Sequence, residues 1–316
     1  MDLPIKKEDR GINAKRISKA FNNVPESSVW LANFTSGRTR RTYRMAILEF
    51  AAAMGFKGEY EWREVKPAHV IAWRKLMEGR GMTDRTIHTR ISALSSLFKH
   101  LCEKQIVRDN PVRSVRRPQV NSDQVESVVM TRKQAAALLS APPGDTLMGM
   151  RDRAIVATFL YTGARIESIC QLQVKDFFED GGYMVLDFKV KGGRIKRVAL
   201  NAEHISILKA YLAKTGTERA TESAFFGRMK GKGHGEKLSQ RHVRNIIKKY
   251  ARMIGLSERI TPHSARATFI TEALEAGVPI EQVQATVDHK TITTTKMYDK
   301  RRISHRDSAT FRVSYS

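Results

Sequence analysis

Side chains that can act on a phosphodiester occur in three short segments of the second half of this sequence. Arg165 stands two residues after a glycine. His263 and Arg266 are three residues apart, so they share one face if their segment is helical. Tyr298 follows His289 by nine residues, with a threonine-rich stretch between them. Together these segments supply two guanidinium groups, two imidazoles and a phenol.

This set fits cleavage of a phosphodiester without a metal ion. That reaction needs a nucleophile, cations that stabilise a pentacovalent phosphorus, and an acid for the leaving alkoxide. Arg165 and Arg266 offer planar, forked donors that suit two non-bridging phosphate oxygens. The phenol of Tyr298 has an ordinary pKa of about 10, so it needs a base or surrounding cations to become a nucleophile.

Other uses of these residues fit the sequence less well. If His263 and His289 were metal ligands, a Cys or carboxylate should stand at ligand spacing from them, and the two arginines would repel a cation. We therefore predict no metal site. Tyr298 is preferred as nucleophile over the other tyrosines; Tyr211 and Tyr250 have the spacing of packing residues, and Tyr315 lacks a basic motif at fixed distance.

Local sequence signals predict the elements that carry these groups. Thr261 suits a helix N-cap and Pro262 the first turn, so the segment that holds His263 and Arg266 should begin a helix. The helix that precedes Arg165, around residues 151–161, should break at Gly163. Over residues 183–200, two β-rich runs flank Lys191-Gly192-Gly193-Arg194, which predicts a hairpin with a tight turn.

Four segments, taken in chain order, resemble the motifs of the tyrosine recombinase (phage integrase) family. The family's Thr-Gly-x-Arg corresponds to Thr162–Arg165, its hairpin lysine to Lys191, and its Thr-Pro-His-x-x-Arg to Thr261–Arg266. Its Gly-His-x-x-x-x-Thr-Thr-x-x-Tyr stretch corresponds to residues 288–298, which end in Tyr298. The motifs cover residues 130–300, and the helical first half is similar to the family's core-binding domain.

The resemblance implies a role for each group. Tyr298 is the nucleophile, His263 accepts its proton, Lys191 donates to the leaving 5′ oxygen and His289 donates to a phosphate oxygen. Arg165 and Arg266 stabilise the phosphate, and no cofactor is required.

The sequence departs from the family pattern at two positions. Ser168 stands where the family usually has Glu or Asp, a residue that supports the arginines and the histidine; Glu167 lies one position earlier, about 100° around a helix. Asp288 replaces the glycine that commonly precedes His289, and we expect its carboxylate to raise the basicity of that imidazole.

The charge of the chain agrees with a nucleic-acid partner. Its 56 Lys and Arg outnumber 32 Asp and Glu, for a net charge of +24, of which residues 1–120 carry +12 and the remainder +12. A neutral enzyme with a basic tail would carry its excess positive charge in one part of the chain. Because both parts of this chain carry the same excess, both are predicted to face phosphate. Two cysteines exclude a disulfide framework, and no apolar run is long enough for a membrane span.

Patterning divides the 316 residues into five parts. We predict a basic arm over 1–25, a helical core-binding domain over 26–112, a basic linker over 113–128, a catalytic domain over 129–302 and a C-terminal tail over 303–316. Because the arm is short, we expect no folded arm-site-binding domain before the bundle. Within the first half, helices are predicted over 38–54 and 83–101, with another from Pro67. Five arginines are predicted to contact DNA, two facing outward from the second of these helices and three in the linker: Arg85, Arg90, Arg113, Arg116 and Arg117.

The predicted fold is therefore mainly α with a small β-sheet or hairpin: a helical core-binding bundle and a mixed α+β catalytic domain that form a C-shaped clamp on DNA. The resemblance implies a site-specific DNA recombinase that forms a 3′-phosphotyrosyl intermediate during integration, excision or resolution. Its partners would be a double-stranded recombination site and other copies of the chain, as a dimer on one site and a tetramer in the synapse, with the tail docked on a neighbour. It would act in the cytoplasm, associated with the nucleoid. Two alternatives stay open: a DNA-relaxing enzyme like type IB topoisomerases, and a non-catalytic DNA-binding protein.

Overall fold

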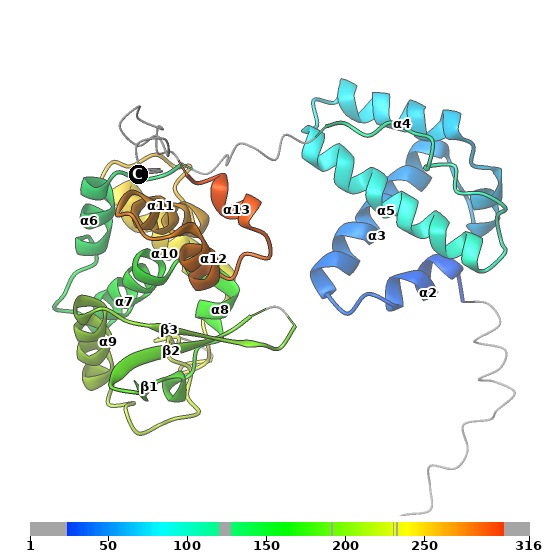
Figure 1. Cartoon of the computed structure of the whole chain (residues 1–316). Helices are drawn as coiled ribbons and strands as arrows, with labels where there is room; N and C mark the ends of the chain where they lie inside the picture. The colour runs from blue at the N-terminus through cyan, green and yellow to red at the C-terminus, as the bar shows by residue number, and fades with distance from the viewer. Residues whose placement is uncertain (1–23, 120–127, 191, 230, 232, 300–316) are drawn as a thin grey trace, which may run out of the picture. The chain divides into compact units, whose positions relative to one another are not determined.

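The chain divides between Asn121 and Ser122 into two compact units, each with its own hydrophobic core (Figure 1). The computed structural model describes residues 24–119, 128–190, 192–229, 231 and 233–299. The predicted arm apart from its last two residues, residues 120–127 of the predicted linker and the whole C-terminal tail lie outside these ranges. Lys191 also lies outside them.

The described part of the first unit is a helical bundle. Its elements are α2 (Glu26–Ala32), α3 (Gly37–Met54), the 3-10 helix η1 (Glu59–Glu64), α4 (Pro67–Gly79) and α5 (Asp84–Glu103).

The helices expected in the first unit are confirmed by these bounds. Thr83 caps α5 by accepting a hydrogen bond from the Thr86 amide, as its position before the apolar stripe indicated. The stripes face inward and meet around fully buried Phe50, Trp73 and Phe98. Hydrophobic burial of one stripe from each helix thus forms this core.

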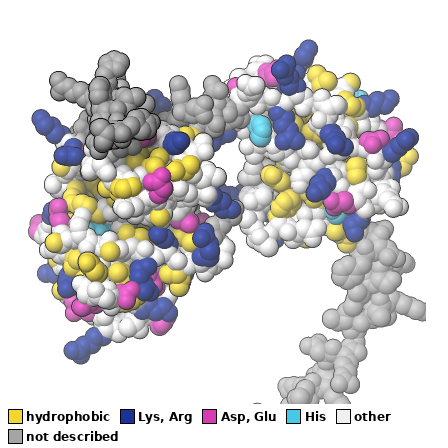
Figure 2. Space-filling view, in the orientation of Figure 1, with side chains coloured by type: hydrophobic (Ala, Val, Ile, Leu, Met, Phe, Trp, Pro, Cys, Tyr) yellow, Lys and Arg dark blue, Asp and Glu magenta, His cyan; other side chains and the backbone are white. Residues whose placement is uncertain are grey.

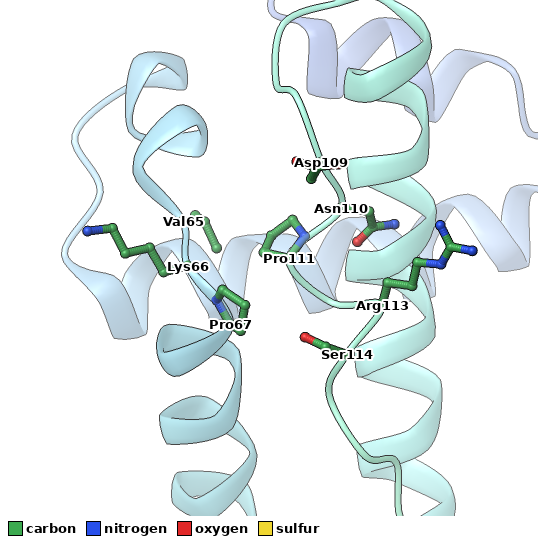
Figure 3. A pocket seen from close by; sticks show the side chains of 8 residues that line it. All are labelled: Val65, Lys66, Pro67, Asp109, Asn110, Pro111, Arg113 and Ser114. Carbon is green, nitrogen blue, oxygen red and sulfur yellow. The ribbon is translucent and has the colours of Figure 1, made fainter.

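The chain remains packed on the first unit beyond α5. Val112 and Val115 are buried in the core of the bundle, and Asn110 donates to the Ser95 carbonyl. Residues 109–111, 113 and 114 line a pocket of about 400 Å³ together with residues 65–67 at the start of α4. Figure 3 shows the Lys66 and Arg113 side chains extending away from one another at this pocket. The first residues of the predicted linker are therefore part of the bundle's surface.

The second unit is a mixed α+β domain. In chain order its elements are α6 (Arg132–Ser140), α7 (Leu147–Thr162), α8 (Ile166–Cys170), η2 (Val174–Asp176), β1 (Phe177–Asp180), β2 (Tyr183–Lys189), β3 (Ile195–Ala199), α9 (Ala202–Thr215), α10 (Gln240–Met253), α11 (Pro262–Glu275), α12 (Ile280–Val287) and α13 (Ile292–Lys296).

Helix α7 is the centre of the second unit. It packs against α6, α9, α10 and α11, so most of its side chains are buried and its sequence shows no polar face (Figure 1). This packing explains why α7 is apolar almost all round. Because α7 packs against helices on several sides, its C-terminal end fixes the position of the residues that follow.

The hairpin predicted over residues 183–200 is confirmed as β2 and β3, and the sequence reasoning missed β1. The three strands form an antiparallel sheet in the order β1-β2-β3, with Lys189 opposite Ile195 next to the turn. Gly192 and Gly193 have φ values of 89° and 76°, a conformation that favours glycine in tight turns. The mainly α fold with a small sheet is thus confirmed.

Candidate functional site

The N-terminal end of α11 carries two of the predicted site residues. Thr261 caps the helix by accepting from the amide of the third helical residue, which fixes the first turn. His263 and Arg266 follow on this turn. The Arg266 guanidinium is only 4% exposed and donates to the carbonyls of Gly163 and Val287, the second at 2.7 Å. One buried arginine therefore ties α11 to the ends of α7 and α12.

Gly163 brings the next arginine to the same place. It ends α7 in the left-handed conformation, with φ 59°, and an added Cβ would lie 2.5 Å from the Phe269 ring. Glycine is required there by both backbone and space. Arg165, two residues on, is the N-cap residue of α8, and its half-exposed guanidinium donates to the carboxylate and the carbonyl of Asp288 at 2.9 and 2.6 Å.

Tyr298 lies beside the two histidines. Its hydroxyl is 3.4 Å from His263 Nε2, and its ring stacks on His289 with 5.9 Å between ring centroids. His289 is oriented in turn by a 3.0 Å hydrogen bond between Nδ1 and the buried Thr295 hydroxyl. Tyr298 itself is 3% exposed and belongs to a hydrophobic cluster with Ala267, Ile270, Leu274, Val283 and Val287.

Partial burial sets the charge state of this cluster. Burial, and then nearby Arg165, lower the pKa of Arg266 to about 10, which still leaves the guanidinium charged at neutral pH. The pKa of His263 is lowered because protein atoms exclude water from part of the ring and because Arg266 is close. Burial raises the pKa of Tyr298, and Arg266 opposes that shift. At pH 7 the cluster thus holds a neutral imidazole next to a protonated phenol.

Asp288 acts to raise the pKa of His289, as expected, but stronger effects outweigh it and the net shift is downward. Burial, followed by the positive charges of Arg266 and Arg165, lowers the pKa of His289 to about 3, and the opposing effect of Asp288 is smaller than these. The Asp288 carboxylate is bonded to Arg165 and Arg194, so its charge is largely compensated by those groups. His289 is therefore neutral at pH 7 and can offer one N–H.

The β2–β3 turn reaches the site through a residue that the sequence reasoning left without a role. Arg194 donates to Asp288 Oδ1 at 3.2 Å, so the turn that carries Lys191 is linked to the residue before His289. Arg194 ends the glycine-containing turn segment, and Asp288 begins the segment that ends in Tyr298. Their pairing joins segments 94 residues apart, and only a structure reveals it.

The predicted DNA-contacting arginines differ in their surroundings. Arg85, Arg113, Arg116 and Arg117 are exposed, although Arg117 also donates to the Ser92 hydroxyl. The outward position expected for Arg90 is wrong, because its guanidinium forms a 2.8 Å ion pair with Glu49 and its side chain is 24% exposed. Glu49 lies on α3, so the two helices neutralise this charge between them.

Helix α10 presents a row of cations that the sequence reasoning did not single out. Its apolar residues Val243, Ile246, Ile247 and Tyr250 are buried, which leaves the basic residues on the opposite, exposed face. These are Arg241, Arg244, Lys248, Lys249 and Arg252. The alternation of apolar and basic residues at helical spacing was the available signal. On the face that Figure 2 shows, Lys and Arg side chains occur over both units.

The described residues contain neither a metal-binding cluster nor a membrane-spanning helix. Within them, no three His, Cys, Asp or Glu side chains converge as metal ligands. None of the helices there is both long enough and apolar enough to cross a membrane.

Comparison with known proteins gives the same family on both units. Residues 128–305 match the phage integrase family, and residues 27–105 match the phage integrase N-terminal SAM-like domain. The tyrosine recombinase XerC of Thermodesulfovibrio yellowstonii is 28% identical over 272 residues, which are 85% of this chain and 88% of that protein. XerC of Chlamydia muridarum is 30% identical over 217 residues, 68% of this chain and 66% of that protein.

Solved structures share the fold. The XerH site-specific recombinase in a post-cleavage complex with palindromic difH substrate superimposes with a TM-score of 0.69 at 19% identity, covering 82% of this chain and 75% of that chain. A lambda integrase (75–356) dimer bound to a COC′ core site gives 0.64 at 18% identity, covering 92% and 98%. The matched domain covers more than half of the sequence, and the chain belongs to the phage integrase family.

Proposed function

We propose that this chain is a site-specific DNA recombinase that cleaves and rejoins DNA through a 3′-phosphotyrosyl intermediate. The observation that carries the proposal is the placement of Tyr298, whose hydroxyl lies 3.4 Å from a histidine of reduced basicity and whose ring stacks on a second. Arg266, a buried cation, lies one helical turn from the first histidine. A tyrosine needed only for packing would not require these partners.

The reaction follows from the groups present. Tyr298 Oη attacks phosphorus while its proton passes to neutral His263 Nε2. The phosphorus–O5′ bond breaks, and Lys191 protonates the leaving oxygen to give a free 5′-hydroxyl. Arg165, Arg266 and the His289 N–H bind the non-bridging oxygens, whose negative charge grows in the transition state. A 5′-hydroxyl then attacks the phosphotyrosine in the reverse sense, so bond energy is conserved and no cofactor is consumed.

Partners and organisation follow from the same proposal. Related structures include a lambda integrase dimer bound to a COC′ core site and a lambda integrase tetramer bound to a Holliday junction, and we expect this chain to form the same assemblies on its own DNA site. Both units, with domains over 26–112 and 129–302, would contact duplex DNA. The exposed basic face of α10 and the arginines at 113, 116 and 117 provide phosphate contacts. The protein would act in the cytoplasm, associated with the nucleoid.

A suicide substrate tests the proposal. Duplex DNA that carries a candidate site and a nick near the cleavage point loses the short 5′-hydroxyl fragment, so the covalent complex accumulates. We expect a 3′-linked adduct that survives denaturant and forms in EDTA, and mass spectrometry of the digested adduct should assign the phosphate to Tyr298. The absence of any adduct on DNA that the protein binds would indicate a non-catalytic DNA-binding protein. Relaxation of supercoiled plasmids without site dependence would indicate a topoisomerase.

A further inference from the structure

Asp288 adopts a backbone conformation that its side chain disfavours. It ends α12 with φ 53° and ψ 51°, in the left-handed region where an L-residue with a Cβ is destabilised. Among described residues other than glycine, only Gln105 shares a positive φ. The family commonly has glycine at the position of Asp288, which has no such cost. Asp adopts this conformation more readily than most residues with a Cβ, and a favourable side-chain interaction can offset the cost that remains relative to glycine.

The Asp288 carboxylate makes that interaction with two cations. Oδ2 accepts from Arg165 at 2.9 Å and Oδ1 from Arg194 at 3.2 Å, while the Asp288 carbonyl accepts from the second terminal nitrogen of Arg165 at 2.6 Å. The Asp288 side chain is 21% exposed, so these charge-assisted bonds are partly shielded from water. Arg165 is therefore held at two points by one residue.

The usual support for this arginine is missing from α8. Ser168 is buried and its hydroxyl donates to the Lys189 carbonyl at 2.7 Å, whereas Glu167 is exposed. Ser168 nevertheless lines the same small cavity as Arg165, Arg266 and Asp288. The Asp288 carboxylate, at the end of α12, thus lines the cavity to which α8 contributes only Ser168.

We propose that Asp288 is a positioning residue for phosphate cleavage: it orients Arg165 in place of the carboxylate absent at position 168. The inference rests on the proposed function, in which Arg165 binds the phosphate. Asp288 and its carbonyl occupy two of the five N–H donors of the guanidinium, which leaves three for phosphate oxygens. The contact thus orients the arginine without blocking it.

The test compares substitutions that separate charge from backbone conformation. Asp288→Gly gives the residue that the backbone prefers and removes the carboxylate, whereas Asp288→Asn keeps the side-chain shape and removes only the charge. Gln105→Gly, at the other positive-φ position, is the matched control for the backbone effect. Ser168→Glu is made alone and together with Asp288→Gly. Each variant is assayed for thermal unfolding, DNA affinity and the single-turnover rate of covalent adduct formation at saturating DNA.

We expect Asp288→Gly to remain folded and to bind DNA normally, yet to form adduct about 10- to 100-fold more slowly, the range expected when a phosphate-binding group shifts by about 1 Å. Asp288→Asn should lose rate in the same direction, and Gln105→Gly should match wild type. Ser168→Glu should restore rate in the Asp288→Gly background, which a merely structural role of Asp288 would not predict. An unchanged or faster rate in both Asp288 variants overturns the inference, as does full additivity of the double variant. If wild type forms no adduct, the proposed function itself fails.

Discussion

The phenol oxygen of Tyr298 should contribute little to the free energy of unfolding, but it should be essential for strand cleavage. Tyr298→Phe removes one hydrogen bond, whose 3.4 Å length is beyond the usual range for a hydroxyl, so its contribution is at most about 0.5 kcal/mol. The ring keeps its apolar neighbours, because the buried cluster contacts carbon atoms that phenylalanine also has. The hydroxyl is desolvated, as its raised pKa reflects, and deleting it recovers part of that cost. The net change should lie within about 1 kcal/mol.

Tyr250→Phe is the matched control, with the opposite expected result. The Tyr250 hydroxyl donates at 3.0 Å to Asp152 Oδ2, and Asp152 is 2% exposed. Removing this donor leaves a buried carboxylate oxygen without its partner, which costs about 1–3 kcal/mol. Arg151 bonds only the other oxygen, Oδ1, and does not replace it. Among the described residues, no hydrogen bond of Arg151, Asp152 or Tyr250 reaches Tyr298 or its two histidines, so cleavage should persist.

Two assays distinguish the variants. Thermal unfolding should shift by no more than about 4 °C for Tyr298→Phe, since 1 kcal/mol corresponds to roughly 2–4 °C in a domain of this size. The unfolding temperature of Tyr250→Phe should fall further than that of Tyr298→Phe. On the suicide substrate, Tyr298→Phe should bind with unchanged affinity and give no adduct, whereas Tyr250→Phe should give adduct at a temperature below its unfolding transition. An adduct formed by Tyr298→Phe would refute the assignment and move the nucleophile elsewhere, with Tyr315 tested first.

Three further predictions concern the base and the DNA contacts. Because the pKa of His263 lies below its ordinary value of 6.5, the neutral base predominates at pH 7. The single-turnover cleavage rate should therefore fall as the pH drops through that lowered pKa, and His263→Gln should be slower and lack this acid limb. His289, with a pKa of about 3, should not titrate between pH 5 and 8, so an acid limb that survives in His263→Gln would contradict the assignment of the base. Replacing Arg113, Arg116 and Arg117 by Ala should reduce the slope of log K against log salt by up to about 3, and an unchanged slope would mean that these arginines do not contact phosphate. Arg90→Ala should lower the free energy of unfolding by up to about 1 kcal/mol through loss of its Glu49 pair, whereas exposed Arg85→Ala should leave stability unchanged and weaken DNA binding; equal unfolding curves for the two variants would refute the distinction.

Local signals in the sequence determined most of the secondary structure around the site. Thr261 and Pro262 marked the start of α11, and Gly163 marked the end of α7, because caps and left-handed glycines act within a few residues of their own position. The paired glycines similarly predicted the β2–β3 hairpin. Strand β1 was missed because its four residues are too few for a period of alternation to be visible. The family motifs further determined which polar residues belong together, since their order and spacing are specific.

The tertiary structure decided how those residues interact. Arg266 bonds carbonyls 103 and 21 residues away, and Asp288 joins Arg165 to Arg194 across 123 and 94 residues. No local periodicity encodes such pairs, because they arise only when α7, α8, α11, α12 and the hairpin pack around one point. The same packing set the charge states: burial made His289 less basic although its sequence neighbour is a carboxylate, and a neighbouring helix neutralised Arg90. Electrostatics depends on distance and solvent exposure in three dimensions, which is why the sequence named the groups but not their ionisation.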